Sequence, residues 1–175
     1  MVFPSFDLTG QVALVTGAAR GLGNAISLAL AHAGADVALG LRDVNARGDL
    51  ADKIGAMGRR AMPLQMDVRR LDQIFQAVDD TVMHLGRLDI LVNNAGLAPD
   101  NLAENVREED FDLTLAVNLK GTFFASQAAG LRPSPDRSAC CRARRRTMAC
   151  AGRRRAAWRP RPGAARTGSR SRRCR

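Results

Sequence analysis

Cysteine is absent from the first 139 residues of this 175-residue chain, and histidine occurs only at His32 and His84. The four cysteines all lie in its last quarter, at Cys140, Cys141, Cys150 and Cys174. No two of them are spaced as CxxC, and neither histidine is near them in the sequence. Because this spacing lacks the pattern of a zinc site, we expect the chain to bind no metal.

Long apolar runs are also missing, since none approaches the roughly 18 residues that a membrane-spanning helix needs. The first ten residues, MVFPSFDLTG, lack the apolar segment of a secretory signal peptide. We therefore expect a cytoplasmic protein with no membrane partner.

Acidic residues are almost absent after residue 129. Residues 130–175 contain 16 arginines, no lysine and one acid, for a net charge of +15. Residues 1–129 contain 11 basic and 16 acidic residues, for a net charge of −5, so the overall +10 describes neither part. We expect a domain over 1–129 and an arginine-rich tail over 130–175. The tail has three large apolar residues, too few to offset the entropy cost of ordering, which predicts disorder.

Two patterns alternate regularly through the first 129 residues. Short apolar runs predict buried parallel strands over 11–16, 36–41, 60–66 and 88–94. Apolar residues at helical spacing predict helices over 24–34, 43–58, 71–86 and 108–129. This alternation predicts an α/β fold with a Rossmann-type, doubly wound parallel sheet, in which right-handed crossovers give the strand order 3-2-1-4. In the last helix, Phe111, Leu115, Leu119 and Phe123 recur in register.

A glycine-rich loop, TGAARGLG (16–23), separates the first strand from the first helix. Glycines there let the chain turn sharply, let the backbone approach a pyrophosphate and let the helix pack on the strand. The N-terminus of the helix then directs N–H groups and a positive dipole toward phosphates. A second motif, NNAG (93–96), ends the fourth strand and lines the same crevice, because ligands lie where the strand order reverses.

These two motifs, together with VNLKGTF (117–123), resemble the classical short-chain dehydrogenase/reductase family over residues 7–129. The resemblance implies an NAD(P)-dependent oxidoreductase that moves a hydride between a nicotinamide dinucleotide and a small carbonyl or alcohol substrate. It also implies a set of cofactor-binding residues, namely Gly17, Gly21, Leu22, Gly23, Asp67, Val68, Asn94, Ala95 and Gly96. Asn118 matches the family's catalytic-site asparagine, which in relatives supports a water and the lysine of a proton relay.

The residues after the second strand bear on the choice of dinucleotide. A carboxylate there binds the ribose 2′-hydroxyl of NAD, whereas a 2′-phosphate needs a cation. If the strand ends at Leu41, the next residue is Arg42, and Arg20 in the glycine loop is a second cation within reach. Asp43, about 20 residues past the loop, would favour NAD if the strand ended two residues later. We favour NADP, with NAD as the alternative.

Tyrosine is absent from the whole chain, and its two lysines are Lys53 and Lys120. The family's chemistry uses a tyrosine as general acid/base, a lysine four residues later that lowers the tyrosine pKa, and a serine upstream that polarises the carbonyl. Ser134 and Ser138 lie in a proline-rich stretch and do not match that serine. Three of the four catalytic roles have no counterpart, so we expect the chain to be catalytically incomplete.

The segment GLRPSPDRS (130–138) occupies the place of a fifth strand, and its two prolines do not suit a central strand. Without that strand, residues 88–94 become a sheet edge. Residues 130–175 have three interpretations: an out-of-frame translation of GC-rich DNA, which we favour, a nucleic-acid-binding arm, or a disordered segment without a role. Nucleic-acid binding through phosphate contacts is therefore the alternative function.

Two properties stay open at this level. The loop 97–107 resembles the substrate-side loop of sugar, polyol and 3-oxoacyl reductases alike, so the substrate is undefined. Relatives commonly form dimers or tetramers through helices around the region that is lost here, so the oligomeric state is also undefined.

Overall fold

The computed structural model describes residues 6–46 and 48–132. Apart from residues 130–132, the arginine-rich tail that we expected to be disordered lies outside the described residues, as do all four cysteines. No helix in the described part of the chain is long and apolar enough to cross a membrane.

A four-stranded parallel sheet forms the centre of the molecule. Its strands are β1 (Val12–Thr16), β2 (Asp36–Leu41), β3 (Ala61–Gln65) and β4 (Ile90–Val92). The observed order, β3-β2-β1-β4, confirms the predicted one. Ala13 of β1 lies opposite Val37 of β2 on one side and Ile90 of β4 on the other. The chain order reverses at β1, so the topological switch point lies beyond the carboxyl ends of β1 and β4, and we call this region the switch-point crevice.

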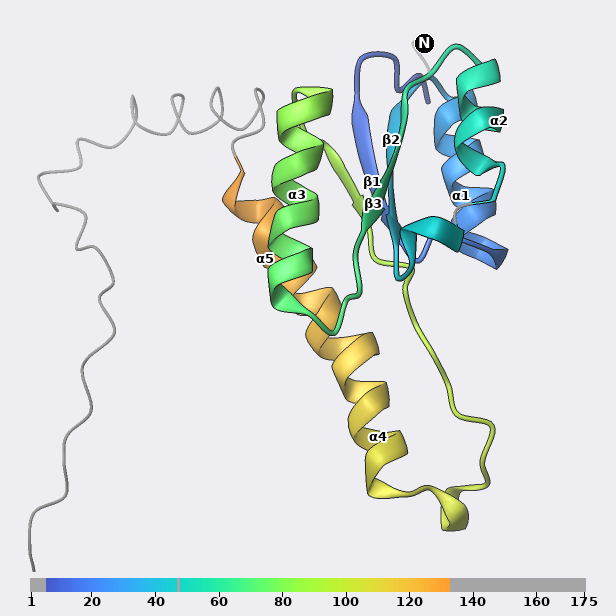
Figure 1. Ribbon diagram of the computed structural model, residues 1–175, viewed down its shortest axis with the longest axis vertical. Coiled ribbons are helices and arrows are strands. Elements are labelled where there is room, and N and C mark those ends of the chain that lie inside the picture. The colour runs from blue at the N-terminus through green and yellow to red at the C-terminus, as the bar shows by residue number, and fades with distance from the viewer. Residues whose placement is uncertain (1–5, 47, 133–175) are drawn as a thin grey trace, which may run out of the picture.

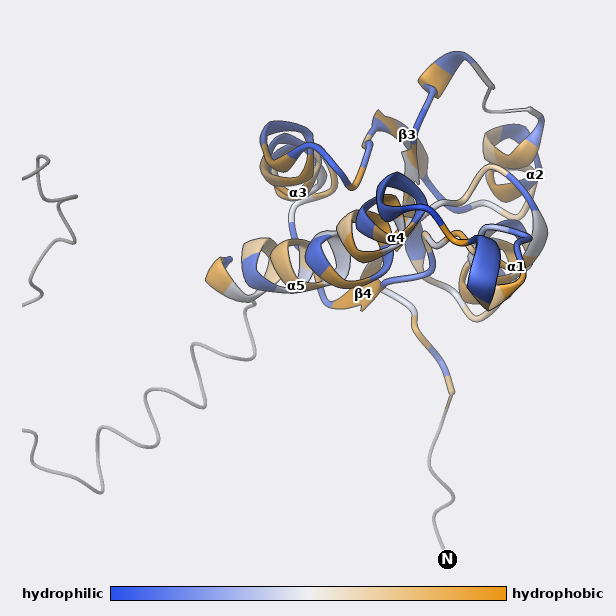
Figure 2. Cartoon of the chain, turned by 90° about the horizontal axis from the view of Figure 1, so that it is seen from below, coloured by the Kyte–Doolittle hydropathy of each residue, from blue (hydrophilic) through white to orange (hydrophobic). Residues whose placement is uncertain are grey.

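Helices cover both faces of this sheet (Figure 1). Helices α1 (Gly21–His32) and α2 (Leu50–Ala56) lie on one face, and α3 (Leu71–Leu85) and α5 (Thr122–Leu131) lie on the other, as Figure 2 also shows from below. Each face has its own buried apolar cluster, one around Leu39 and Ile54 and the other around Leu14 and Ile74. Coverage on both sides explains why every residue of β1 is buried.

The helix predicted over 43–58 is shorter in the structure. A 3-10 turn occupies Val44–Ala46, and Gly48, with a φ of 58°, precedes α2. The carboxylate of Asp43 accepts the backbone N–H of Asn45 at 2.9 Å. Such a local side-chain bond offers the backbone an alternative to the helix, which accounts for the late start of α2.

The helix predicted over 108–129 is continuous but changes type along its length. Helix α4 (Glu108–Leu115) passes through a π-helical stretch (Ala116–Gly121) into α5, which ends two residues later than predicted. We call residues 108–131 the α4–α5 rod. Its first part extends beyond the sheet (Figure 1), and no residue of α4 is buried.

Candidate functional site

The glycine loop lies tightly against the segment that follows β4. Gly17 has a φ of 68°, and a Cβ on it would lie 2.9 Å from the Cα of Ala95. A Cβ on Gly23 would lie 2.3 Å from the carbonyl oxygen of Gly17. Neither position accepts a side chain, so the loop stays close to the ends of the strands. Helix α1 begins at Gly21, and its N-terminal N–H groups form a site of the kind that binds phosphates.

Thr16, at the end of β1, connects this loop to the NNAG motif. Its buried hydroxyl accepts the backbone N–H groups of Asn94 and Ala95, both at 3.0 Å, and donates to the carbonyl oxygen of Val92 at 3.3 Å. The Asn94 amide donates back to the carbonyl oxygens of Thr16 (2.9 Å) and Gly17 (3.1 Å). These bonds hold the two motifs together at the switch point, as the sequence predicted from topology alone.

Asp67 and Val68 follow β3 and lie beside the rod. The carboxylate of Asp67, a residue only 9% exposed, receives Arg69 Nε at 3.0 Å on both oxygens and the Arg69 backbone N–H at 3.0 Å. The hydrogen bonds from Arg69 hold the pKa of the Asp67 carboxyl below its usual value, although burial opposes this. A Cβ on Gly121 of the rod would lie 2.9 Å from the Cβ of Val68, so this pair is fixed between sheet and rod.

The residues that follow β2 differ in what they contact. The strand ends at Leu41, as predicted, so Arg42 is the first residue beyond it, and its side chain is exposed. Arg42 lies near enough to Asp67 to lower the pKa of that carboxyl through its charge. The Asp43 carboxylate instead bonds the backbone of its own turn. Arg20 precedes α1 and is also exposed.

Asn118 lies in the π-helical stretch and joins the rod to the segment beyond NNAG. Its Oδ1 accepts the Leu97 backbone N–H at 3.0 Å, and its Nδ2 donates to the Leu97 carbonyl oxygen at 2.8 Å. A Cβ on Gly96 would lie 3.5 Å from the same Oδ1. The structure thus holds Asn118 against the segment that follows NNAG. The oxygen and the nitrogen of its side-chain amide both bond the backbone of Leu97.

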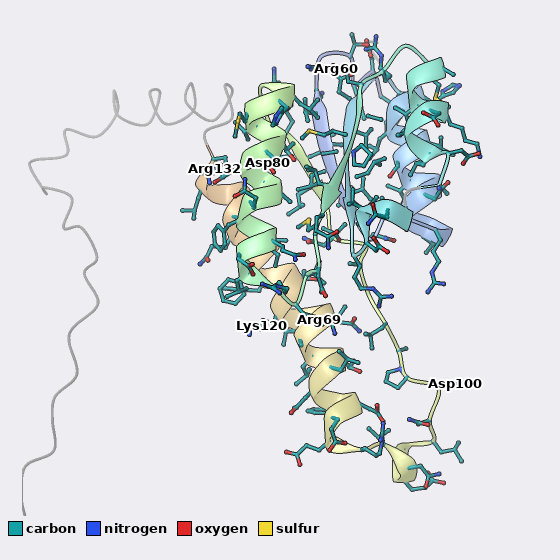
Figure 3. The ribbon with its side chains drawn as sticks, in the orientation of Figure 1. Arg60, Arg69, Asp80, Asp100, Lys120 and Arg132 are labelled. Carbon is teal, nitrogen blue, oxygen red and sulfur yellow. The ribbon has the colours of Figure 1, made fainter. Side chains whose placement is uncertain are left out.

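Neither lysine has a recorded contact with the residues of this crevice. Lys53 pairs with Asp49 at 2.9 Å on the surface of α2, and Lys120 is exposed on the rod, where Figure 3 labels it. Within residues 6–46 and 48–132, no group of three His, Cys, Asp or Glu side chains could hold a metal ion. Among the described residues, this region therefore combines a glycine loop at the N-terminus of α1 with polar strand ends, and neither lysine contacts it.

Three supporting residues were not among those that the sequence predicted for the site. Thr16 holds NNAG, Arg69 holds the Asp67 carboxylate, and Gln73 accepts the Asp67 backbone N–H at 2.8 Å. A threonine directly before the first loop glycine was a usable signal, because a strand end at a switch point favours polar residues. Arg69 and Gln73 bond Asp67 within the turn between β3 and α3. The pattern of apolar residues does not define the shape of that turn.

Comparisons with known proteins agree with this geometry. Residues 11–132 match the family model of the short chain dehydrogenases. The chain is 41% identical over 129 residues to 2-dehydro-3-deoxy-D-gluconate 5-dehydrogenase of Escherichia coli, which covers 74% of this chain and 50% of that relative. A short chain dehydrogenase from Burkholderia cenocepacia, solved in complex with NADP, is 41% identical with a TM-score of 0.68 over 71% of this chain and 51% of its own.

A short chain dehydrogenase from Mycobacterium paratuberculosis, solved bound to NAD, is 32% identical with a TM-score of 0.68, covering 72% of this chain and 51% of its own. The chain therefore belongs to the short-chain dehydrogenase/reductase family. It spans about half the length of the relatives that it matches. The nucleic-acid-binding alternative gains no support from fold or relatives, and all its tail arginines except Arg132 lie outside the described residues.

Proposed function

We propose that this chain binds a nicotinamide dinucleotide at the switch-point crevice, as part of an NAD(P)-dependent oxidoreductase acting on a small carbonyl or alcohol. The observation that carries the proposal is the connection of Asn94 and Thr16 to the glycine loop beside the N-terminus of α1. Phosphates fit there because backbone N–H groups and the helix dipole converge on a loop without side chains at Gly17 and Gly23. When bound, the dinucleotide would supply the hydride for carbonyl reduction.

Each predicted residue has a place in this binding mode. Gly17, Gly21, Leu22 and Gly23 form the pyrophosphate loop and the first turn of α1. The remaining contacts, to adenine and ribose, come from the strand ends: Asp67, Val68, Asn94, Ala95 and Gly96. Asn118 is proposed to keep the segment at residue 97 in position on the nicotinamide side, through its two bonds to Leu97.

We propose that binding is retained without turnover, because the chain contains no tyrosine to donate the proton. The test is a titration of purified protein with NADPH and NADH, followed by cofactor fluorescence and by calorimetry. We expect saturable binding, and no carbonyl-dependent oxidation of NADPH. Absence of a signal up to millimolar cofactor would refute the binding site, and turnover at a family-like rate would refute the proposed loss of activity.

The finer proposal is a preference for NADP over NAD. Its support is that β2 ends at Leu41, which places Arg42 at the ribose position while the Asp43 carboxylate is occupied by Asn45. We expect Arg42→Ala to weaken NADPH binding about tenfold and NADH binding little, since one charge-assisted phosphate contact is lost. Arg107→Ala, which removes an exposed arginine paired with Asp110 on α4, is the control. Equal effects of Arg42→Ala on both cofactors would contradict the preference.

We further propose that residues 1–129 are the unit that binds the cofactor and that the protein is cytoplasmic. The family match over 11–132 supports the first point, and α5 continues that unit to Leu131.

A further inference from the structure

Gln65, the last residue of β3, bonds the segment that follows the neighbouring strand β2. Its side-chain Nε2 donates to the Arg42 carbonyl oxygen at 2.7 Å, and its Oε1 accepts the Val44 backbone N–H at 3.1 Å. Leu41 and Gln65 are partners in the parallel ladder, so this side chain extends the contact between β2 and β3 past the end of the sheet. One side-chain amide therefore holds two backbone groups, one on each side of Asp43.

These two bonds fix the direction in which Arg42 and Asp43 are presented. The Arg42 carbonyl belongs to the peptide group before Asp43, and the Val44 N–H belongs to the peptide group after it. Because a peptide group is planar, holding both groups fixes the backbone dihedrals of Asp43. In this conformation the Asp43 carboxylate turns back onto the Asn45 N–H at 2.9 Å, whereas the Arg42 side chain is exposed.

The same network connects this segment to the turn that follows β3. Gln73 Oε1 accepts the Asp67 backbone N–H at 2.8 Å and lies 3.5 Å from Gln65 Nε2. The Arg69 hydrogen bonds, and to a smaller extent the charge of Arg42, lower the pKa of the Asp67 carboxyl. Asp67 forms its ion pair with Arg69. The carboxylate nearest to Arg42 is thus already engaged, which leaves the Arg42 guanidinium available to an anionic ligand.

We propose that Gln65 is a positioning residue for the choice between NADP and NAD. It holds residues 42–44 so that the Arg42 guanidinium, rather than the Asp43 carboxylate, is presented to the ribose 2′ position. Gln65 acts through the backbone of Arg42 and not by contact with the cofactor. This inference rests on the proposed function, because it concerns the same dinucleotide site.

The first test replaces the amide and keeps the length of the side chain. Without its two bonds, residues 42–44 occupy the phosphate-binding orientation for only part of the time, and affinity falls by that fraction. We expect Gln65→Met to raise the NADPH dissociation constant about fivefold and to change the NADH constant less than about twofold, measured by calorimetry. Gln65→Asn, whose amide is one methylene shorter, should shift the ratio in the same direction.

Gln76→Met is the matched control for this exchange. Gln76 is exposed on α3 and donates to Asp80 Oδ1 at 2.7 Å, so the variant also loses one side-chain amide and its hydrogen bond. Both dissociation constants should stay at their wild-type values. A second readout needs no cofactor: the Val44 amide should exchange with solvent at least about tenfold faster in Gln65→Met and at the wild-type rate in Gln76→Met.

A double-mutant cycle separates positioning from a general loss of stability. If Gln65 acts through Arg42, Gln65→Met should raise the NADPH constant less than about twofold in an Arg42→Ala background. A loosened sheet would instead weaken both cofactors and add to the effect of Arg42→Ala.

The outcomes distinguish this inference from the proposed function. A wild type that binds neither cofactor would refute the proposed function, and the role of Gln65 with it. Binding by the wild type with equal losses of NADPH and NADH in Gln65→Met would overturn the role of Gln65 alone. An additive effect in the Arg42→Ala background, or unchanged exchange at Val44, would do the same.

Discussion

Gly23 sits where helix α1 leaves the glycine loop, with no room for a methyl group. The Cβ of an alanine would lie 2.3 Å from the Gly17 carbonyl oxygen and 2.5 Å from the Asn94 amide nitrogen. Both neighbours are themselves held by hydrogen bonds, so neither can yield without disturbing the end of β1. Gly17 and Gly23 are thus required by packing as well as by any ligand.

We expect Gly23→Ala to lower the free energy of unfolding by about 2–3 kcal/mol, because the clash falls on backbone. It should also abolish dinucleotide binding. Chemical denaturation measures the first effect. Gly55→Ala is the control, because nothing lies within 4 Å of its Cβ in α2, and a gain of up to about 1 kcal/mol is expected there. Similar losses for both variants would contradict this account.

Asp67 makes stability depend on pH through its bonds with Arg69. Its folded pKa is lowered from 3.8, chiefly by those bonds, so the unfolded chain takes up the proton first as pH falls. The stabilisation is complete well above pH 4 and is lost as the pH falls through the folded pKa. We expect Asp67→Asn to cost about 1 kcal/mol at pH 7 and to flatten the acid limb of the stability curve. An unchanged limb in denaturation between pH 5 and pH 2 would refute this role.

At the scale of elements, the α4–α5 rod combines two environments in one helix. Its C-terminal part packs on the sheet through Ala125 and Ala128, whereas α4 has no buried residue. The π-helical stretch lies at the change, where Gly121 touches Val68 and Asn118 binds Leu97. The rod is therefore anchored to the crevice at its middle, and the segment after β4 depends on that anchor.

We expect Asn118→Ala to release this segment, because both hydrogen bonds to the Leu97 backbone are lost. The cost should be about 1–2 kcal/mol, and the Leu97 amide should exchange with solvent at least tenfold faster. Hydrogen-exchange mass spectrometry of the segment 95–100 measures this. Asn105→Ala, in the short 3-10 turn before α4, is the control and should leave that exchange unchanged. Unchanged protection at Leu97 would show that other contacts hold the segment.

Element boundaries show where sequence patterns are weak. The period of apolar residues predicted all four strands, but β4 is shorter than the predicted 88–94, because only residues 90–92 have β1 partners. The same apolar period predicted one long helix over 108–129. The π-helical stretch does not interrupt the recurrence of an apolar residue every four positions, so the pattern gives no sign of it. The 3-10 turn before α2 depends on a side-chain bond of Asp43 that the apolar pattern does not register.

At the scale of the whole molecule, the chain corresponds to about half of the relatives that it matches. In the described part, β4 pairs with β1 alone, although its sequence is apolar like that of a central strand. A groove of about 470 Å³ borders it, lined by residues that include Leu91, Asn93 and Ser126. The relatives are about twice as long as the matched segment, so their remaining half has no counterpart in the match.

This arrangement leads to a prediction about the gene. We expect the DNA that encodes residues 127–135 to contain a change of reading frame, because the arginine-rich composition begins there, directly after the family motifs. Another frame downstream should encode a serine-bearing strand followed by YxxxK. Resequencing of genomic DNA and transcript tests this. An uninterrupted frame with no such motif in any register would show that residues 130–175 are the native continuation.

The sequence by itself determined the fold class, the strand order and the proximity of the glycine loop to NNAG. The hydrophobic period gives the elements, and short right-handed connections allow few arrangements of them in one parallel sheet. It also showed that none of the 175 residues is a tyrosine, a fact that needs no coordinates. Only the tertiary structure decided how the site is held. Thr16 and Asn118 act through hydrogen bonds to backbone groups distant in sequence. Arg69 acts through bonds to the Asp67 carboxylate within a turn. Such geometry leaves no trace in the period of apolar residues. It also decided that Phe111, Leu115, Leu119 and Phe123 are exposed, because exposure depends on which elements lie opposite them.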